Sequence, residues 1–106
     1  MATKHDVLAK LATHIGKRNG IMGEDLARAL GIPSREVRKH ITTLVNDDQI
    51  GICGHPATGY YIAATEDELQ NTIDFHTQRA LHELKKASSL SKQPLADLVG
   101  QLHLET

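Results

Sequence analysis

The chain has 106 residues, a size typical of one compact domain, and its hydrophobic content of 40% suffices for a small core. With one Phe, two Tyr and no Trp, this core must consist mainly of Leu, Ile, Val and Ala. The formal net charge of −1 excludes a chain that is basic throughout. Residues 1–43 nevertheless hold eight Lys or Arg against four acids, whereas residues 44–106 hold four against nine. The chain therefore has a basic front and an acidic back.

A helix is predicted near the start of the chain, from about Lys4 to Lys17. Its apolar residues recur at steps of one, three and four, so they form one face that closes a small helical core. Positive charge and a glycine then end the helix. The residues of this face are Val7, Leu8, Leu11 and Ile15.

Two more helices joined by a tight turn are predicted over residues 23–46. The first runs from Gly23 to Leu30 and has acids in its first turn, where negative charge suits the helix dipole. Gly31 can take the positive φ of a helix end, and Pro33 suits the first position of the next helix. The faces predicted to pack inward carry Leu26, Ala29 and Leu30 on the first helix and Val37, Ile41, Leu44 and Val45 on the second.

The opposite face of the second helix is rich in hydrogen-bond donors. Arg pairs bidentately with guanine, and Lys neutralises phosphate. A solvated helix face is the alternative interpretation, since such faces are usually charged. Because this helix stands second in a helix-turn-helix and precedes a hairpin, we predict that it reads the major groove of DNA. The predicted DNA-binding residues on it are Ser34, Arg35, Arg38, Lys39 and Thr42.

Two short β-prone runs follow, from Gln49 to Cys53 and from Tyr60 to Ala63, joined by a turn-rich loop over residues 54–59. A hairpin in this position is a wing. His55 and Thr58 are predicted to contact a phosphate or the minor groove, although the loop holds no Arg or Lys. A purely structural hairpin is the alternative.

Residues 26–50, LARALGIPSREVRKHITTLVNDDQI, resemble the helix-turn-helix module at the front of the bifunctional biotin ligase repressors and related bacterial regulators. The Gly59-Tyr60 pair resembles the return strand of their wing. The resemblance covers about residues 5–63 and implies that the five residues named on the second helix face DNA. No ligase domain follows, so nothing about biotin carries over. A winged helix with a short helical tail is also similar to small phage and prophage regulators.

A long helix is predicted from Thr65 to about Leu90, with Thr65 as its cap and Glu68 at the capping-box position. Because it is longer than so small a domain needs, and because readers of two half-sites are usually dimers, we predict that it pairs with a second copy. Folding back to complete the core is the alternative. The predicted dimerisation residues are Leu69, Ile73, His76, Ala80, Leu84 and Ala87.

These elements predict a mainly α fold with a small β-hairpin: a winged helix-turn-helix, a long C-terminal helix and a short terminal helix. The winged helix-turn-helix domain spans residues 4–63. A helical extension over residues 65–106 serves for dimerisation, with a hinge over residues 88–93 and a last helix that Pro94 opens.

Catalysis and metal binding find little support in the sequence. The seven His residues are never three or four apart, and Cys53 has no second thiol. We therefore predict no catalytic residue, no metal site and no cofactor. Without a signal peptide or an apolar run near 18 residues, the chain is expected in the cytoplasm and away from membranes. The expected function is a small dimeric regulator that binds double-stranded DNA; the alternative is a winged-helix protein-protein interaction module.

Overall fold

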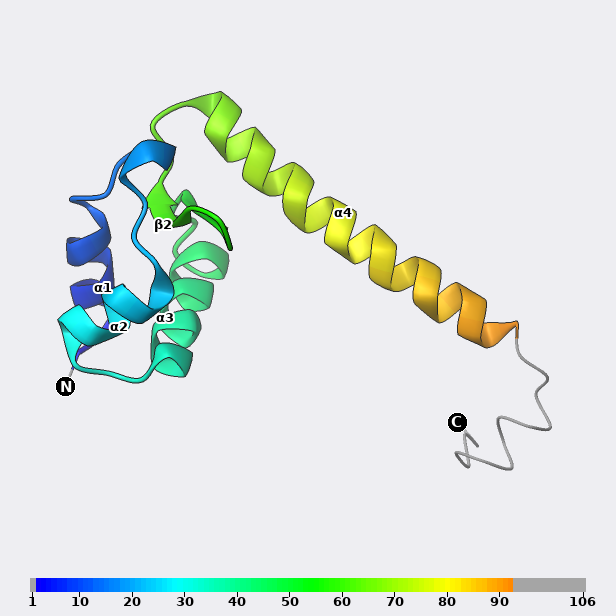
Figure 1. Cartoon of the computed structure of the whole chain (residues 1–106), viewed down its shortest axis with the longest axis horizontal. Helices are drawn as coiled ribbons and strands as arrows, with labels where there is room; N and C mark the ends of the chain where they lie inside the picture. Colours follow the sequence, from blue (N-terminus) through cyan, green and yellow to red (C-terminus); the bar gives the residue numbers. More distant parts are fainter. Residues whose placement is uncertain (1, 93–106) are drawn as a thin grey trace. The chain divides into compact units, whose positions relative to one another are not determined.

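A computed structural model of the chain describes residues 2–92, which divide between two compact units, Met1–Ile73 and Asp74–Thr106. The predicted fold class, mainly α with a small β-hairpin and a long C-terminal helix, is confirmed. The short terminal helix expected from Pro94 lies outside the described residues. The elements, shown in Figure 1, are α1 (Lys4–Leu11), the short 3-10 helix η1 (Lys17–Asn19), α2 (Gly23–Leu30), α3 (Ser34–Asn46), β1 (Ile52–His55), β2 (Gly59–Ile62) and α4 (Glu66–Ser91).

The core of the first unit lies among α1, α2 and α3, which pack together in Figure 1. Each helix contributes apolar residues at steps that keep them on one face, and β1 adds one more. Burial of each larger aliphatic side chain contributes about 1.5–3 kcal/mol. The core residues are Val7, Leu11, Leu26, Ala27, Val37, Ile41, Leu44 and Ile52.

The turn between α2 and α3 forms as predicted. Gly31 ends α2 with a φ of 67°, and the Ile32 N–H donates to the Ala27 carbonyl at 3.1 Å. Pro33 stands one residue earlier than expected, because α3 begins at Ser34. The Pro33 carbonyl accepts hydrogen bonds from the first turn of α3, so it still fixes the start of that helix.

Two residues expected in the core face solvent. Ala29 is exposed, whereas Ala27, two residues earlier in the same helix, is buried in the core. Val45 is 37% exposed, whereas Leu44 is 1% exposed. The reason is geometric: at about 100° per residue, Val45 lies roughly 70° from the centre of the buried face of α3, at the edge of that face.

The first helix ends at Leu11, so its predicted extension to Lys17 is wrong. The chain turns at residues 12–14 and then runs beside β2. The Gly16 N–H donates to the Ile62 carbonyl at 2.8 Å, and Ile21 and Tyr60 exchange backbone hydrogen bonds of 2.8 and 2.7 Å. This pairing with a distant strand takes the place of a helical ladder. It also leaves Ile15 half-exposed instead of in the helical core.

The hairpin is antiparallel and pairs Ile52 with Ile62, and His55 with Gly59. Its first strand begins three residues later than predicted, because Gln49 takes a φ of 57°. The Ile50 N–H then donates to the Leu44 carbonyl at 3.0 Å, which closes the turn after α3.

The start of α4 is capped as predicted, since the Glu68 N–H donates to the Thr65 hydroxyl at 3.1 Å. The helix runs to Ser91, so the expected hinge is wrong over Ser88–Ser91: these residues are helical. The first compact unit continues past the expected boundary at residue 63 and ends at Ile73. None of the helices within residues 2–92 combines the length and the apolar character needed to cross a membrane.

The Glu68 carboxylate fastens the start of α4 to the first unit. It accepts the backbone N–H of Lys17 at 3.0 Å and that of Ala64 at 2.8 Å. Hydrogen bonds from the Lys17 and Ala64 backbone lower the pKa of Glu68 below its ordinary value of 4.5.

Two buried polar side chains lie near the start of α4. The buried Cys53 thiol donates to the Glu68 backbone carbonyl at 3.7 Å. Burial raises the pKa of the Tyr61 hydroxyl, which is also hydrogen-bonded to Thr72.

We expect Glu68→Gln to lower the melting temperature in a pH-dependent manner. A carboxyl whose folded pKa is lowered stabilises the fold above its unfolded pKa, and this contribution disappears as pH falls through the folded pKa. The melting difference from the unchanged protein should therefore be full near pH 7 and shrink as the pH falls below 4.5, through the lowered pKa of Glu68. Thermal unfolding followed by circular dichroism measures it. Glu66→Gln, an exposed acid of the same turn, is the control; a Glu68→Gln difference that stays constant with pH would contradict the prediction.

Candidate nucleic-acid interface

The surface of α3 divides into two arcs. Because successive helix residues are about 100° apart, the buried residues Val37, Ile41 and Leu44 fall within about 60°. The predicted DNA-binding residues occupy a separate arc of about 140°. Ser34, at the edge of this arc, is half-buried, and the other four are exposed: Arg35, Arg38, Lys39 and Thr42.

The positive charges on this arc have no ion-pair partner within residues 2–92. Among the described residues, Arg35, Arg38 and Lys39 form no ion pair. Two basic residues elsewhere in the first unit do: Lys4 lies 2.8 Å from Asp48, and the exposed Arg28 lies 3.0 Å from Asp25. Lys10, Lys17 and Arg18 likewise form no ion pair among the described residues, so what distinguishes α3 is that its three cations share one exposed arc.

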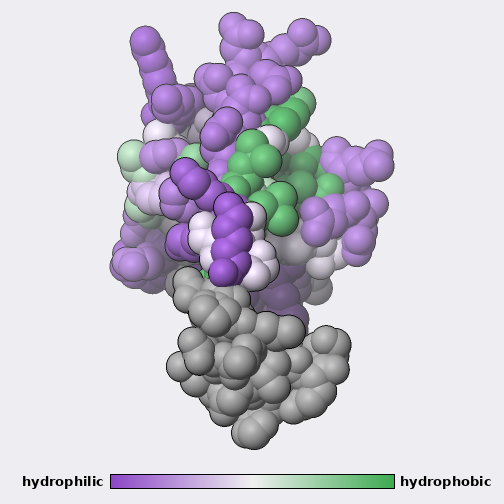
Figure 2. All heavy atoms as spheres, turned by 90° about the vertical axis from the view of Figure 1, so that its right-hand side faces the viewer, coloured by the Kyte–Doolittle hydropathy of each residue, from purple (hydrophilic) through white to green (hydrophobic). Residues whose placement is uncertain are grey.

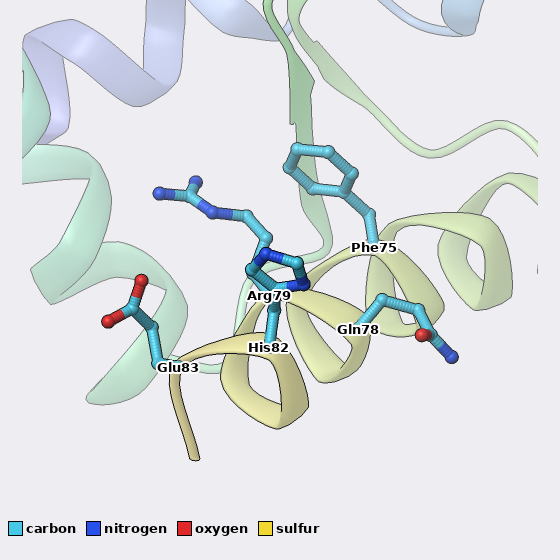
Figure 3. Close-up of a pocket in the computed structure, with 5 residues that line it drawn as sticks. All are labelled: Phe75, Gln78, Arg79, His82 and Glu83. Atoms are coloured by element: carbon cyan, nitrogen blue, oxygen red, sulfur yellow. The ribbon is translucent and has the colours of Figure 1, made fainter. Parts of the chain in front are cut away.

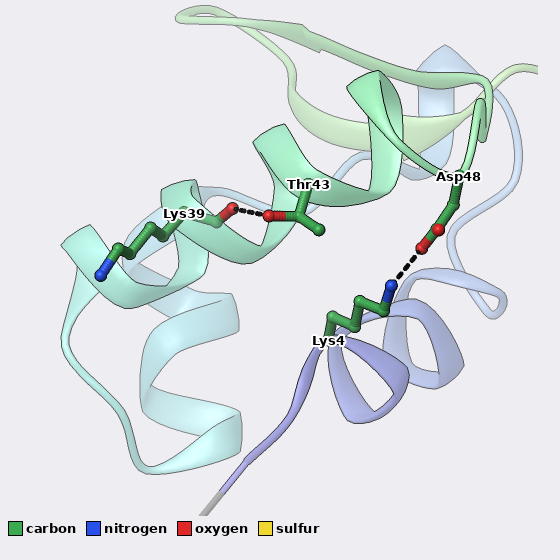
Figure 4. Close-up of polar contacts among 4 residues, drawn as sticks. All are labelled: Lys4, Lys39, Thr43 and Asp48. Atoms are coloured by element: carbon green, nitrogen blue, oxygen red, sulfur yellow. Dashed lines mark hydrogen bonds and ion pairs between the residues drawn. The ribbon is translucent and has the colours of Figure 1, made fainter.

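An ion pair anchors the C-terminal end of α3, and a side-chain hydrogen bond lies within the helix. The Lys4–Asp48 ion pair joins the start of α1 to the residues just after α3 (Figure 4). Thr43 turns its hydroxyl back to the Lys39 carbonyl at 3.2 Å, so it serves the helix backbone. In Figure 4 the Lys39 side chain extends away from these contacts. Its ammonium group therefore lies away from both contacts.

Two further residues lie on the same arc and were missed by sequence reasoning. Val45 was assigned to the core and Asn46 to the helix stop, yet both are exposed and helical. An Asn amide can pair with adenine, and a small apolar group can contact the thymine methyl. The 3.6-residue period, extended to the end of the helix, would have placed both residues here.

The hairpin loop presents polar groups but is tightly organised. The His55 Nδ1 accepts the Ala57 N–H at 3.0 Å, and the Thr58 N–H donates to the His55 carbonyl at 3.1 Å. His55 is exposed and Thr58 is half-buried. The Thr58 hydroxyl donates to the Gly59 carbonyl at 3.3 Å. His55 is therefore more accessible to a ligand than Thr58.

The predicted dimerisation residues lie on one stripe of α4 and are all exposed. Leu69 is 38%, Ile73 47% and Leu84 64% exposed. Thr72, which is not one of these residues, is the buried residue of α4. In the described part of the chain, the stripe therefore does not pack into the core, which was the alternative role predicted for this helix. Figure 2 shows hydrophobic residues at the molecular surface among hydrophilic ones.

A different side of α4 carries a shallow hollow of about 330 Å³. The Arg79 guanidinium lies 5.7 Å from the centre of the Phe75 ring, with Gln78, His82 and Glu83 around them (Figure 3). Such a cation–π contact covers part of an aromatic side chain that a single helix cannot bury. The hollow is lined by one helix only and offers little enclosure for a small molecule.

Within residues 2–92, no group of three or more His, Cys, Asp or Glu side chains is placed to hold a metal ion. Cys53 is fully buried, whereas His55 is exposed, so the two side chains are not presented together.

Comparison of the chain with protein-family models, curated proteins and solved structures gives no match. Its function must therefore be inferred from the geometry of the chain itself.

Proposed function

We propose that this chain is a sequence-specific double-stranded DNA-binding protein. It is a small dimeric regulator of bacterial or phage type that acts in the cytoplasm, with α2 and α3 as a helix-turn-helix and the hairpin as its wing. In this proposal α3 enters the major groove, and the hairpin contacts the flanking backbone.

The exposed arc of α3 is the observation that carries the proposal. It presents two Arg and one Lys that make no ion pair within the described residues, while the opposite arc is fixed in the core. Arg35 and Arg38 suit bidentate pairing with guanine, and Lys39 suits a phosphate. Rigid placement on a packed helix lets these donors meet bases without a large ordering cost.

The proposal is tested by binding to labelled duplexes across a salt series. The duplexes are a random pool and the DNA upstream of the gene itself. Neutralising phosphates releases counterions, so affinity should fall linearly with salt on logarithmic axes, with a slope of about −0.9 per phosphate contact. Selective, salt-dependent binding supports the proposal. No binding at low salt would overturn it in favour of a winged-helix module that binds another protein.

Lys39→Ala should weaken binding to selective and random duplexes by the same factor. Because Lys39 is assigned to a phosphate, its loss should also reduce the salt slope by about one contact, roughly 0.9. Titration of both duplexes at several salt concentrations measures this. A change of sequence preference in Lys39→Ala would instead assign Lys39 to a base.

A further inference from the structure

The second half of α4 has no partner within the described chain. Every α4 residue from His76 to Ser91 is exposed, including Leu84 at 64% and Leu90 at 61%. An isolated helix of this length is marginal in water unless its apolar face is covered. The stripe named above, with Ala80 near its centre, is therefore an interaction surface.

The charges of α4 indicate what covers this surface. Residues 66–78 carry four acids and no Lys or Arg, a net charge of −4. Residues 79–91 carry three basic residues and one acid, a net charge of +2. The helix dipole favours acids in the first turn, but its influence fades within that turn, so it does not account for Asp74 or Arg79.

We propose that α4 pairs with α4 of a second copy in antiparallel orientation. Antiparallel pairing places the acidic half of each helix beside the basic half of the other, whereas parallel pairing would place like charges together. A second copy of this chain supplies the complementary charges, because each α4 has both an acidic half and a basic half. The inference deepens the proposed dimer, and its link to half-sites rests on the proposed DNA binding.

Pairing about Ala80 has a definite register. Ile73 of one copy lies beside Ala87 of the other, and His76 lies beside Leu84, because the members of each pair are equally far from Ala80. Ile73 thus meets the small Ala87, and Ala80 at the centre allows close approach. The Glu66 ends are about 40 Å apart along the pair at a rise of 1.5 Å per residue.

Disulfide cross-linking of the full chain distinguishes the orientations. Ile73→Cys and Ala87→Cys proteins are oxidised separately and as an equal mixture. In the antiparallel pair the two copies of residue 87 are about 21 Å apart along the axis, beyond the reach of a disulfide, whose Cα atoms lie within about 7 Å. We expect covalent dimer from the mixture at least tenfold above that from either variant alone.

Two controls accompany this experiment. Ala80→Cys should cross-link by itself, and the unchanged chain should not, since Cys53 is fully buried. Efficient cross-linking of Ala87→Cys with itself would overturn the antiparallel orientation. A monomer in analytical ultracentrifugation at all concentrations would overturn the dimer. Either result leaves the proposed DNA binding to be judged separately by the salt series, which needs no dimer.

Discussion

The double variant Arg35→Ala/Arg38→Ala should lose selective DNA binding. Each Arg is exposed on the arc of α3 that faces away from the core and forms no ion pair within the described residues. Loss of one bidentate contact to guanine costs about 1–3 kcal/mol. The double variant should therefore bind its selected duplex about 30-fold to 20,000-fold more weakly, since about 1.4 kcal/mol corresponds to a factor of ten. Fluorescence anisotropy at fixed salt measures the change.

Arg28→Ala is the matched control for this variant. Arg28 is also an exposed Arg of the same unit, but it lies on α2 and its guanidinium is 3.0 Å from Asp25. Its loss should leave the sequence preference unchanged. Far-ultraviolet circular dichroism should show equal helix content in all variants, because none of these side chains is buried. Unchanged selectivity in Arg35→Ala/Arg38→Ala would contradict the assignment of α3 as the recognition helix.

Gly59→Ala should destabilise the first unit by about 2–5 kcal/mol. Gly59 begins β2 with a φ of 76°, which costs a residue with a Cβ about 1–2 kcal/mol. An added Cβ would also overlap the Ile21 carbonyl and lie 2.7 Å from the Met22 nitrogen. Separating these backbones costs a further 1–3 kcal/mol or so. Urea denaturation followed by circular dichroism gives the free energy of unfolding.

Gly31→Ala is the control that separates the conformational cost of a positive φ from the steric cost of the added Cβ in Gly59→Ala. Gly31 has a similar φ of 67°, but an added Cβ there meets nothing within 4 Å. Its substitution should cost only the conformational part, about 1–2 kcal/mol. If both variants lost the same stability, the close approach of Gly59 to Ile21 would have no energetic weight.

Local patterns in the sequence were enough to locate most elements. The bounds of α2 were predicted to the residue, because acids at its start and Gly31 at its end are signals that depend only on neighbours. The outward position of Arg35, Arg38, Lys39 and Thr42 likewise followed from the 3.6-residue period. The cap of α4 at Thr65 and Glu68 is a local signal as well.

Features that depend on contacts between segments far apart in the chain were decided only by the tertiary structure. It ended α1 at Leu11, because the backbone that follows pairs with β2, whose residues lie about 40 to 50 positions further along the chain. It also turned the Glu68 carboxylate toward the Lys17 N–H, 51 positions earlier in the chain. Periodicity reports which residues share a face. Which face is buried, and where a helix yields to strand pairing, is set by hydrogen bonds and packing between segments far apart in the chain.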